Sequence, residues 1–135
     1  MQLGESHRIN LKRDKQLLST VFNGYYPDSL IIEKAIYQKH MLQGVGYALY
    51  KLKIKPVDYE KLLEKINAET ETYMFNMAVL RFEGDKKGTE YQNCSFSYIH
   101  DGFEKYRNEI RLSAEVSSDT VVVFLHVIEP QLINL

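Results

Sequence analysis

The stretch from Thr120 to Ile128, TVVVFLHVI, constrains the possible fold more than any other part of the chain. Six of its nine residues are β-branched, and His126 is the only strongly polar one. The turn-forming residues 117–119 come directly before it, as is typical at the start of a strand. The pattern predicts a strand that is buried on both faces and paired with residues 106–116.

Two helices are predicted before the first strand. Apolar residues recur at helical spacing over 11–22, where Asn10 is placed to cap the helix and the pair Asn23-Gly24 to end it. Residues 30–42 are ambiguous, because their apolar residues share one helical face while charged residues interrupt both faces of a strand. A helix is favoured there, and a strand is the alternative.

A strand, a connecting helix and a strand meander are predicted to follow. Residues 47–54 form a strand that Pro56 ends, and Pro56 also suits the first position of a helix that reaches about Asn67. Turn-forming residues then separate four further segments of strand-like sequence. These segments are 73–83, 89–99, 106–116 and 120–128.

Together these elements predict an α+β fold in a single domain of residues 1–135. Its antiparallel sheet has about five strands, in the order of one strand and helix followed by the four-strand meander. The two N-terminal helices and the connecting helix are expected to pack on one face of this sheet.

The lengths of the connections predict which side chains share a face, because side chains alternate along a strand. Pairing Val116 with Val121 brings apolar residues together throughout the last hairpin, Ile110 with Val127 among them. Pairing Glu83 with Thr89 in the first hairpin would set Ala78 opposite Cys94.

The middle connection, after Ile99, decides the orientation of both hairpins. A two-residue turn at Asp101-Gly102 would set Asn93 against Ile110, which mixes a polar with an apolar face. A connection with an odd number of residues instead puts Cys94 and Phe96 on the same face as Ile110. That face is predicted to be the core, covered by the helices.

The opposite face is predicted to carry a polar stripe between two apolar borders. An open sheet with one solvated face should be polar across all its strands, so either a helix covers these borders or another chain does. The predicted members of the face are Tyr73, Phe75, Met77, Val79, Asn93, Ser95, Ser97, Arg107, Glu109, Arg111, Ser113, Glu115, Val122, Phe124, His126 and Ile128.

Charge and cysteine content exclude several classes of function. The net charge is −1, with 17 basic and 18 acidic residues spread along the chain, so no nucleic-acid partner is expected. Cys94 is the only cysteine, and the first 25 residues contain no apolar run like a signal peptide, which favours a cytoplasmic protein. No run approaches the roughly 18 to 20 apolar residues of a membrane span, so no membrane partner is expected either.

No catalytic residue, metal site or cofactor is predicted. None of the four histidines has metal-ligand spacing to another histidine or to Cys94, and no glycine-rich phosphate loop is present. The predicted register turns Cys94 into the core and His126 away from it, which separates the one possible thiol and base pair. His126, predicted opposite Arg111, is more typical of a hydrogen-bonded packing residue than of a catalyst.

The absence of catalytic groups, the mixed polar and apolar face and the ten tyrosines favour a non-enzymatic protein-binding module. In size and element order the chain resembles the small immunity proteins that neutralise bacterial toxins, and also cone-shaped α+β folds with a pocket on a curved sheet. The first resemblance implies a bacterial immunity-type or inhibitor protein whose partner is a toxin or enzyme.

The second resemblance implies an alternative function, a small-molecule-binding or isomerase-like domain. On the predicted register, Tyr73, Arg111 and His126 would line its closed pocket. A homodimer that covers the face twice is a third possibility. The predicted partner-binding residues are Tyr73, Asn93, Ser95, Arg107, Glu109, Arg111, Glu115 and His126.

Overall fold

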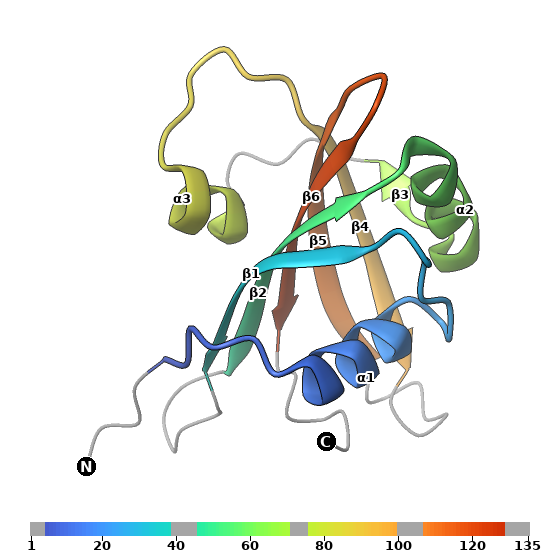
Figure 1. Cartoon of the computed structure of the whole chain (residues 1–135), viewed down its shortest axis with the longest axis vertical. Coiled ribbons are helices and arrows are strands. Elements are labelled where there is room, and N and C mark those ends of the chain that lie inside the picture. The colour runs from blue at the N-terminus through green and yellow to red at the C-terminus, as the bar shows by residue number, and fades with distance from the viewer. Residues whose placement is uncertain (1–4, 39–45, 71–75, 100–106, 129–135) are drawn as a thin grey trace.

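The computed structural model describes residues 5–38, 46–70, 76–99 and 107–128. They form one antiparallel sheet of six strands in the order β1-β2-β6-β5-β4-β3, together with three helices (Figure 1). The α+β class and the antiparallel sheet are confirmed, with six strands where about five were predicted. The elements are α1 (Leu11–Val21), β1 (Ile31–Gln38), β2 (Tyr47–Ile54), α2 (Pro56–Ile66), β3 (Glu69–Thr70), α3 (Met77–Glu83), β4 (Gln92–Ile99), β5 (Arg107–Val116) and β6 (Val121–Ile128).

Helices α1 and α2 pack on one side of the sheet, the first face, and both were predicted. Asn10 caps α1 by accepting a hydrogen bond from the backbone N–H of Arg13, and Asn23 ends it in a left-handed conformation at φ 55°. Pro56 opens α2, and Asn67 ends it, again in a left-handed conformation. The first face carries the main core, because apolar residues of β2, β4, β5 and β6 are buried against these helices.

A buried carboxylate fixes the start of α1 on this face. Asp14 is fully buried, and its Oδ1 accepts a hydrogen bond of 2.7 Å from the hydroxyl of Tyr50 on β2. Its Oδ2 accepts a second bond, of 2.9 Å, from the backbone N–H of Asn10. A buried charge is tolerated only when it is paired and hydrogen-bonded, and the side chain of Arg13 supplies the pairing at 3.1 Å.

The predicted register of the last three strands is confirmed. Val116 pairs with Val121 and Ile110 with Val127, so the inward residues of β5 and β6 are apolar. Ile99 pairs with Arg107, which leaves the odd number of seven residues, 100–106, between the paired positions. Parity therefore places the buried Cys94 and Phe96 on the first face, as expected.

The predicted helix at 30–42 is wrong where the structure describes it, because residues 31–38 form β1; residues 39–42 lie outside the described part. A β-bulge shifts the pairing with β2 between Ile32 and Lys34. The extra residue breaks the strict alternation of side chains and gives the apolar residues a helix-like spacing. The strand is also covered on both faces, since Ala35 packs in the first-face core and Ile36 on the other side.

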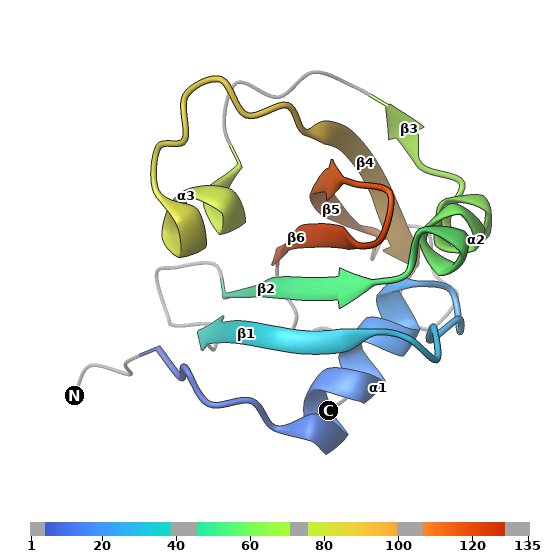
Figure 2. The same ribbon diagram turned by 45° about the horizontal axis from the view of Figure 1, so that its top comes forward.

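The predicted strand at 73–83 is also wrong, because Met77–Glu83 is the helix α3; residues 71–75 lie outside the described part. The side chain of Asn76 caps the N-terminus of this helix, and Gly84, at φ 70°, is its C-cap residue. Cys94 therefore pairs with Thr70 of β3 and not with Ala78. The meander consists of β4, β5 and β6, and α3 lies across the sheet from α1 and α2 (Figure 2).

The described helices thus match the prediction in number, three, but differ from it in placement. One N-terminal helix, α1, precedes the sheet instead of two, and helices cover both faces instead of one. At its outer edge, β1 receives one backbone bridge, in which Ser6 and Tyr37 exchange two hydrogen bonds of 2.8 Å.

Candidate functional site

The candidate site lies on the second face, the side of the sheet turned away from α1 and α2. The register places Ser95, Arg111 and His126 side by side in one row across β4, β5 and β6. Leu49 of β2 continues the row beyond His126. The predicted position of Arg111 opposite His126 is confirmed, so three of the predicted binding residues are direct neighbours.

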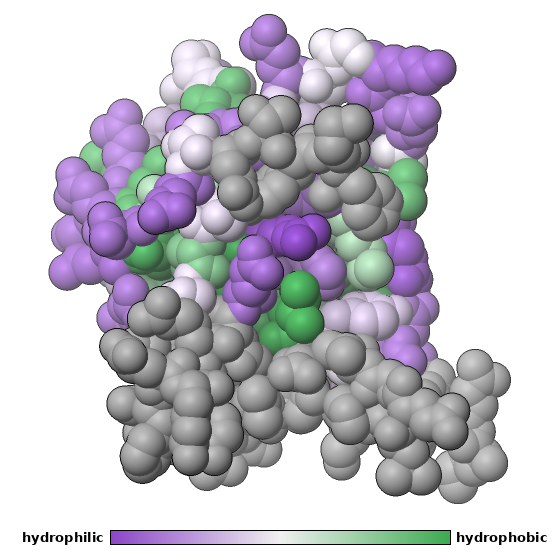
Figure 3. All heavy atoms as spheres, turned by 180° about the vertical axis from the view of Figure 1, so that it is seen from behind, coloured by the Kyte–Doolittle hydropathy of each residue, from purple (hydrophilic) through white to green (hydrophobic). Residues whose placement is uncertain are grey.

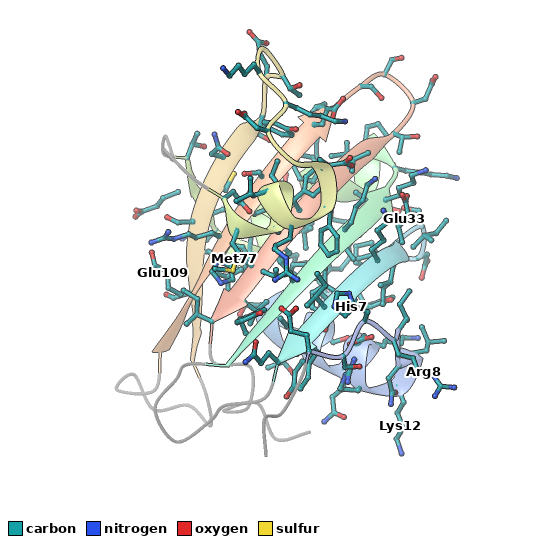
Figure 4. All side chains as sticks on the ribbon, turned by 90° about the vertical axis from the view of Figure 1, so that its left-hand side faces the viewer. His7, Arg8, Lys12, Glu33, Met77 and Glu109 are labelled. Carbon is teal, nitrogen blue, oxygen red and sulfur yellow. The ribbon has the colours of Figure 1, made fainter. Side chains whose placement is uncertain are left out.

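Helix α3 covers the apolar part of the second face. Ala78 of α3 is fully buried against Ile36, Leu49 and Phe124, and Met77 packs around the same cluster. In Figure 4, α3 lies across the strands between Glu33, near the β1 side, and Glu109, on the β5 side. A helix or another chain was predicted to cover the apolar borders of the second face. At the border formed by Leu49 and Phe124, the structure shows that a helix covers it.

A polar network ties the start of α3 to the sheet. The Asn76 side chain donates to Ser113 Oγ at 2.9 Å, and Ser113 Oγ donates to Asn93 Oδ1 at 2.6 Å. Ser113 is almost completely buried, which strengthens the requirement that its hydroxyl be hydrogen-bonded. Asn93, predicted to contact a partner, is therefore already used to hold α3 in place.

Ion pairs hold the rest of α3. Nη1 and Nη2 of Arg81 each donate a hydrogen bond of 2.8 Å to the Glu5 carboxylate, which also accepts a hydrogen bond from the hydroxyl of Tyr47. These contacts with Arg81, and then with Tyr47, lower the pKa of Glu5 to about 2. At the end of α3, Lys51 lies 2.6 Å from Glu83. The helix is thus a fixed border of the remaining open part of the second face.

Replacing Glu5 by glutamine is expected to loosen α3. The change removes a bidentate pair that is about three-quarters buried on the Glu5 side and contributes about 1 kcal/mol. Because the pKa of Glu5 is lowered in the fold, its contribution is present above pH 4.5 and is lost as the pH falls towards 2. We expect amide hydrogen exchange at Leu80 and Phe82 to become about fivefold faster at neutral pH. Glu64→Gln on α2 is the matched control, and equal exchange in both variants would contradict the role of the pair.

His126 is an uncharged side chain at neutral pH. Burial, and secondarily the charge of Arg111, lowers the pKa of His126 to about 4. A neutral imidazole next to a guanidinium offers hydrogen bonds to a partner without adding a second positive charge. The second face therefore has one positive charge in this row, at Arg111.

A cavity of about 570 Å³ lies at the outer edge of β4, beside this row, and is named the β4-edge hollow. Ser95 and Ser97 contribute to it from the second face, together with the exposed carboxylates of Glu69 and Glu109. Figure 3 shows this side of the molecule, where hydrophilic side chains lie next to hydrophobic ones. The remaining lining residues are Ile66, Asn67 and Phe96.

The other predicted binding residues are dispersed. Glu115 is exposed at the far end of β5, where it pairs with Val122, and does not line the hollow. Arg107 pairs with Ile99 through the backbone, and its side chain is outside the described part. Tyr73 lies outside the described residues altogether. Of the predicted binding residues, the candidate site keeps Ser95, Glu109, Arg111 and the neighbouring His126 of β6. Together with Ser97, which pairs with Glu109, they are named the β4–β5 face.

Sequence reasoning missed the contributions of Asn67 and Glu69 to the hollow. Both depend on β3, which has only two residues, Glu69 and Thr70, and pairs with β4 directly after α2. The available signal was the alternation of glutamate and threonine over 69–72, because threonine favours strands.

The structure keeps Cys94 apart from His126, the one thiol and base pair considered from the sequence. Cys94 is buried on the first face, where burial raises its pKa, while His126 lies on the second face. Within the described ranges, no three histidine, cysteine or carboxylate side chains gather in a way that could hold a metal ion. The arrangement offers polar contacts and hydrogen bonds and is suited to binding.

Comparisons of the chain with protein-family models, with curated proteins and with solved structures gave no match. None of the described helices has the length and apolar character needed to cross a membrane.

Proposed function

We propose that this chain is a non-enzymatic protein-binding module, of the inhibitor or toxin-neutralising (immunity) type, that contacts its partner through the β4–β5 face. The observation that carries the proposal is the row of Ser95, Arg111 and His126 between the border made by α3 and the β4-edge hollow. The row thus places hydrogen-bonding side chains and one positive charge next to apolar residues.

Such a surface has the composition of a binding hot region. Arginine at the centre of a patch can bind a carboxylate through two hydrogen bonds while its aliphatic part contacts apolar groups. His126 and Ser95 beside it supply neutral donors and acceptors. Because α3 is fixed by the Asn76 network and the Arg81 pair, the face is preorganised, which reduces the entropy lost on binding.

The second candidate function, a small-molecule-binding domain, is favoured by the size of the hollow. Its volume of about 570 Å³ lies within the range of small-ligand pockets. Its described lining, however, has two apolar side chains, Ile66 and Phe96, whereas such pockets are mostly apolar. Neither Arg111 nor His126 is among the described residues that line the hollow. A protein partner therefore fits this face better.

The double charge reversal Arg111→Glu with Glu109→Lys tests the proposal. It keeps the net charge and inverts the field of the β4–β5 face, so affinity for a partner isolated with the wild-type protein is expected to fall at least about thirtyfold. The measurement is calorimetric titration of the purified partner. Inhibition or neutralisation further predicts that an equimolar amount of wild-type protein, but not of the variant, abolishes the partner's activity.

A matched control makes the same exchange of charges on the helices of the first face. Lys12 and Glu64 are both exposed, on α1 and α2, and Lys12→Glu with Glu64→Lys places each new charge favourably for the helix dipole. This control should bind like the wild type. Equal affinity of the wild type and the β4–β5 variant would refute the assignment of the surface.

A further inference from the structure

Among the described strands, only β3 pairs with the outer edge of β4, and it covers part of that edge. Strand β3 pairs with two residues of β4, Cys94 and Ser95, and from Phe96 onwards no described strand lies beside it. No backbone hydrogen bond among the described residues joins Phe96 or Ser97 to the connection between α2 and β3. In an antiparallel strand every second residue directs its N–H and C=O to each side, so either Phe96 or Ser97 presents an unused pair.

This edge opens into the β4-edge hollow, and the two charged residues of its described lining are both acidic. Glu69 and Glu109 line it, and neither forms an ion pair within the described part of the chain. Ser95 and Ser97 add hydroxyl groups that can accept hydrogen bonds. A side chain that enters the hollow therefore meets two carboxylates and two hydroxyls, which complement an organic cation.

We infer that the partner binds with an extended segment that adds a strand to the free edge of β4 and inserts a lysine or arginine side chain between Glu69 and Glu109. The inference rests on the proposed function and specifies the kind of segment that the partner presents. In strand addition, backbone hydrogen bonds supply affinity, and a pocket for one side chain supplies specificity. The edge at Phe96 and Ser97 supplies the backbone groups, and the hollow supplies the pocket.

The geometry favours a flexible cationic side chain over a metal ion. No group of three metal-ligating side chains occurs in the described ranges. A volume of about 570 Å³ is far larger than a dehydrated ion needs, but it accommodates a lysine or arginine with neighbouring backbone.

The test is a selection of short extended peptides, about eight residues long, from a random library on the intact protein. We expect selected peptides to carry one lysine or arginine between β-branched residues. Their affinity for the double variant Glu69→Gln with Glu109→Gln should be about tenfold lower than for the wild type. The matched control, Glu60→Gln with Glu64→Gln, removes two exposed carboxylates of α2 that do not line the hollow, and it should bind like the wild type.

Backbone methylation of the selected peptide tests strand addition separately. N-methylation at one alternate set of residues should abolish binding, and at the other set it should be tolerated, because only one side of an added strand pairs with β4. Tolerance of both sets, absence of a basic residue, equal binding to the double glutamine variant, or failure of the library to yield a binder would each overturn the inference. If these peptide tests fail but a folded partner binds the Arg111→Glu with Glu109→Lys variant more weakly than the wild type, the inference is wrong and the proposed function stands.

Discussion

Replacing Phe124 by alanine is expected to lower the free energy of unfolding by about 3 to 5 kcal/mol. Phe124 is fully buried in the cluster under α3, where its ring and that of Tyr91 form a T-shaped pair with the centroids 6.0 Å apart. The truncation leaves a cavity that the tethered helix cannot fill without breaking its ion pairs. Denaturant titration of both proteins measures the difference.

Val122→Ala provides the control for Phe124. Val122 belongs to the same strand and packs around the same cluster, but it is only partly buried and smaller. Its truncation should cost roughly 1 kcal/mol. If Phe124→Ala cost no more than this control, α3 would not be packed on the second face as described.

Acidification is expected to destabilise the fold through His126 by about 2 to 3 kcal/mol between pH 6.5 and pH 4. In the unfolded chain His126 takes up a proton near its ordinary pKa of 6.5, whereas in the folded protein burial and Arg111 lower the pKa to about 4. The unfolded state therefore binds more protons in this range, and stability falls as the pH is lowered through it. Denaturant titrations at a series of pH values measure the effect.

The contribution of His126 is isolated by comparison with His126→Gln. Glu5, Glu33 and Glu83 have lowered pKa values and also lose their stabilising effect in acid, but they do so equally in both proteins. The difference in unfolding free energy between wild type and variant should therefore shift steadily from pH 6.5 to pH 4 in favour of the variant. A constant difference over this range would show that His126 is not desolvated.

The sequence predicted the register of β4, β5 and β6 correctly, because these strands follow one another and the parity of each connection decides which side chains share a face. The β-branched run of β6 and the turn before it determine the pairing of Val116 with Val121. The parity argument at the connection after Ile99 then places Ser95 and Arg111 on the second face. This part of the candidate site was predictable because side-chain alternation in a regular hairpin leaves only two choices.

The segments that the sequence predicted incorrectly are those where tertiary packing overrides the local pattern. In β1, the bulge after Ile32 and coverage of both faces removed the alternation that identifies a strand. In α3, Met77 and Val79 read as alternate residues of a strand, and the helix has only seven residues. Asn76 and Gly84, which cap it, were the usable signals.

The hollow could not be predicted, because it depends on contacts between separate elements. Its lining joins the end of α2 at Asn67, the short strand β3 at Glu69, and β5 at Glu109. Neither helical nor strand periodicity reports where the end of a helix meets the edge of a sheet. Only the three-dimensional arrangement brings these residues together.

The bulge in β1 and the Ser6 bridge have a consequence for assembly. Copies of a protein form a filament by sheet pairing only when both outer strands can pair. Each added copy uses one edge strand to bind and must offer its other edge strand to the next copy. In this protein one margin is distorted by the bulge, carries the exposed Lys34 and is already bonded to Ser6 at Tyr37. These features disfavour pairing of another chain along β1, so a strand added at the other margin, as inferred above for the partner, would not propagate into a filament.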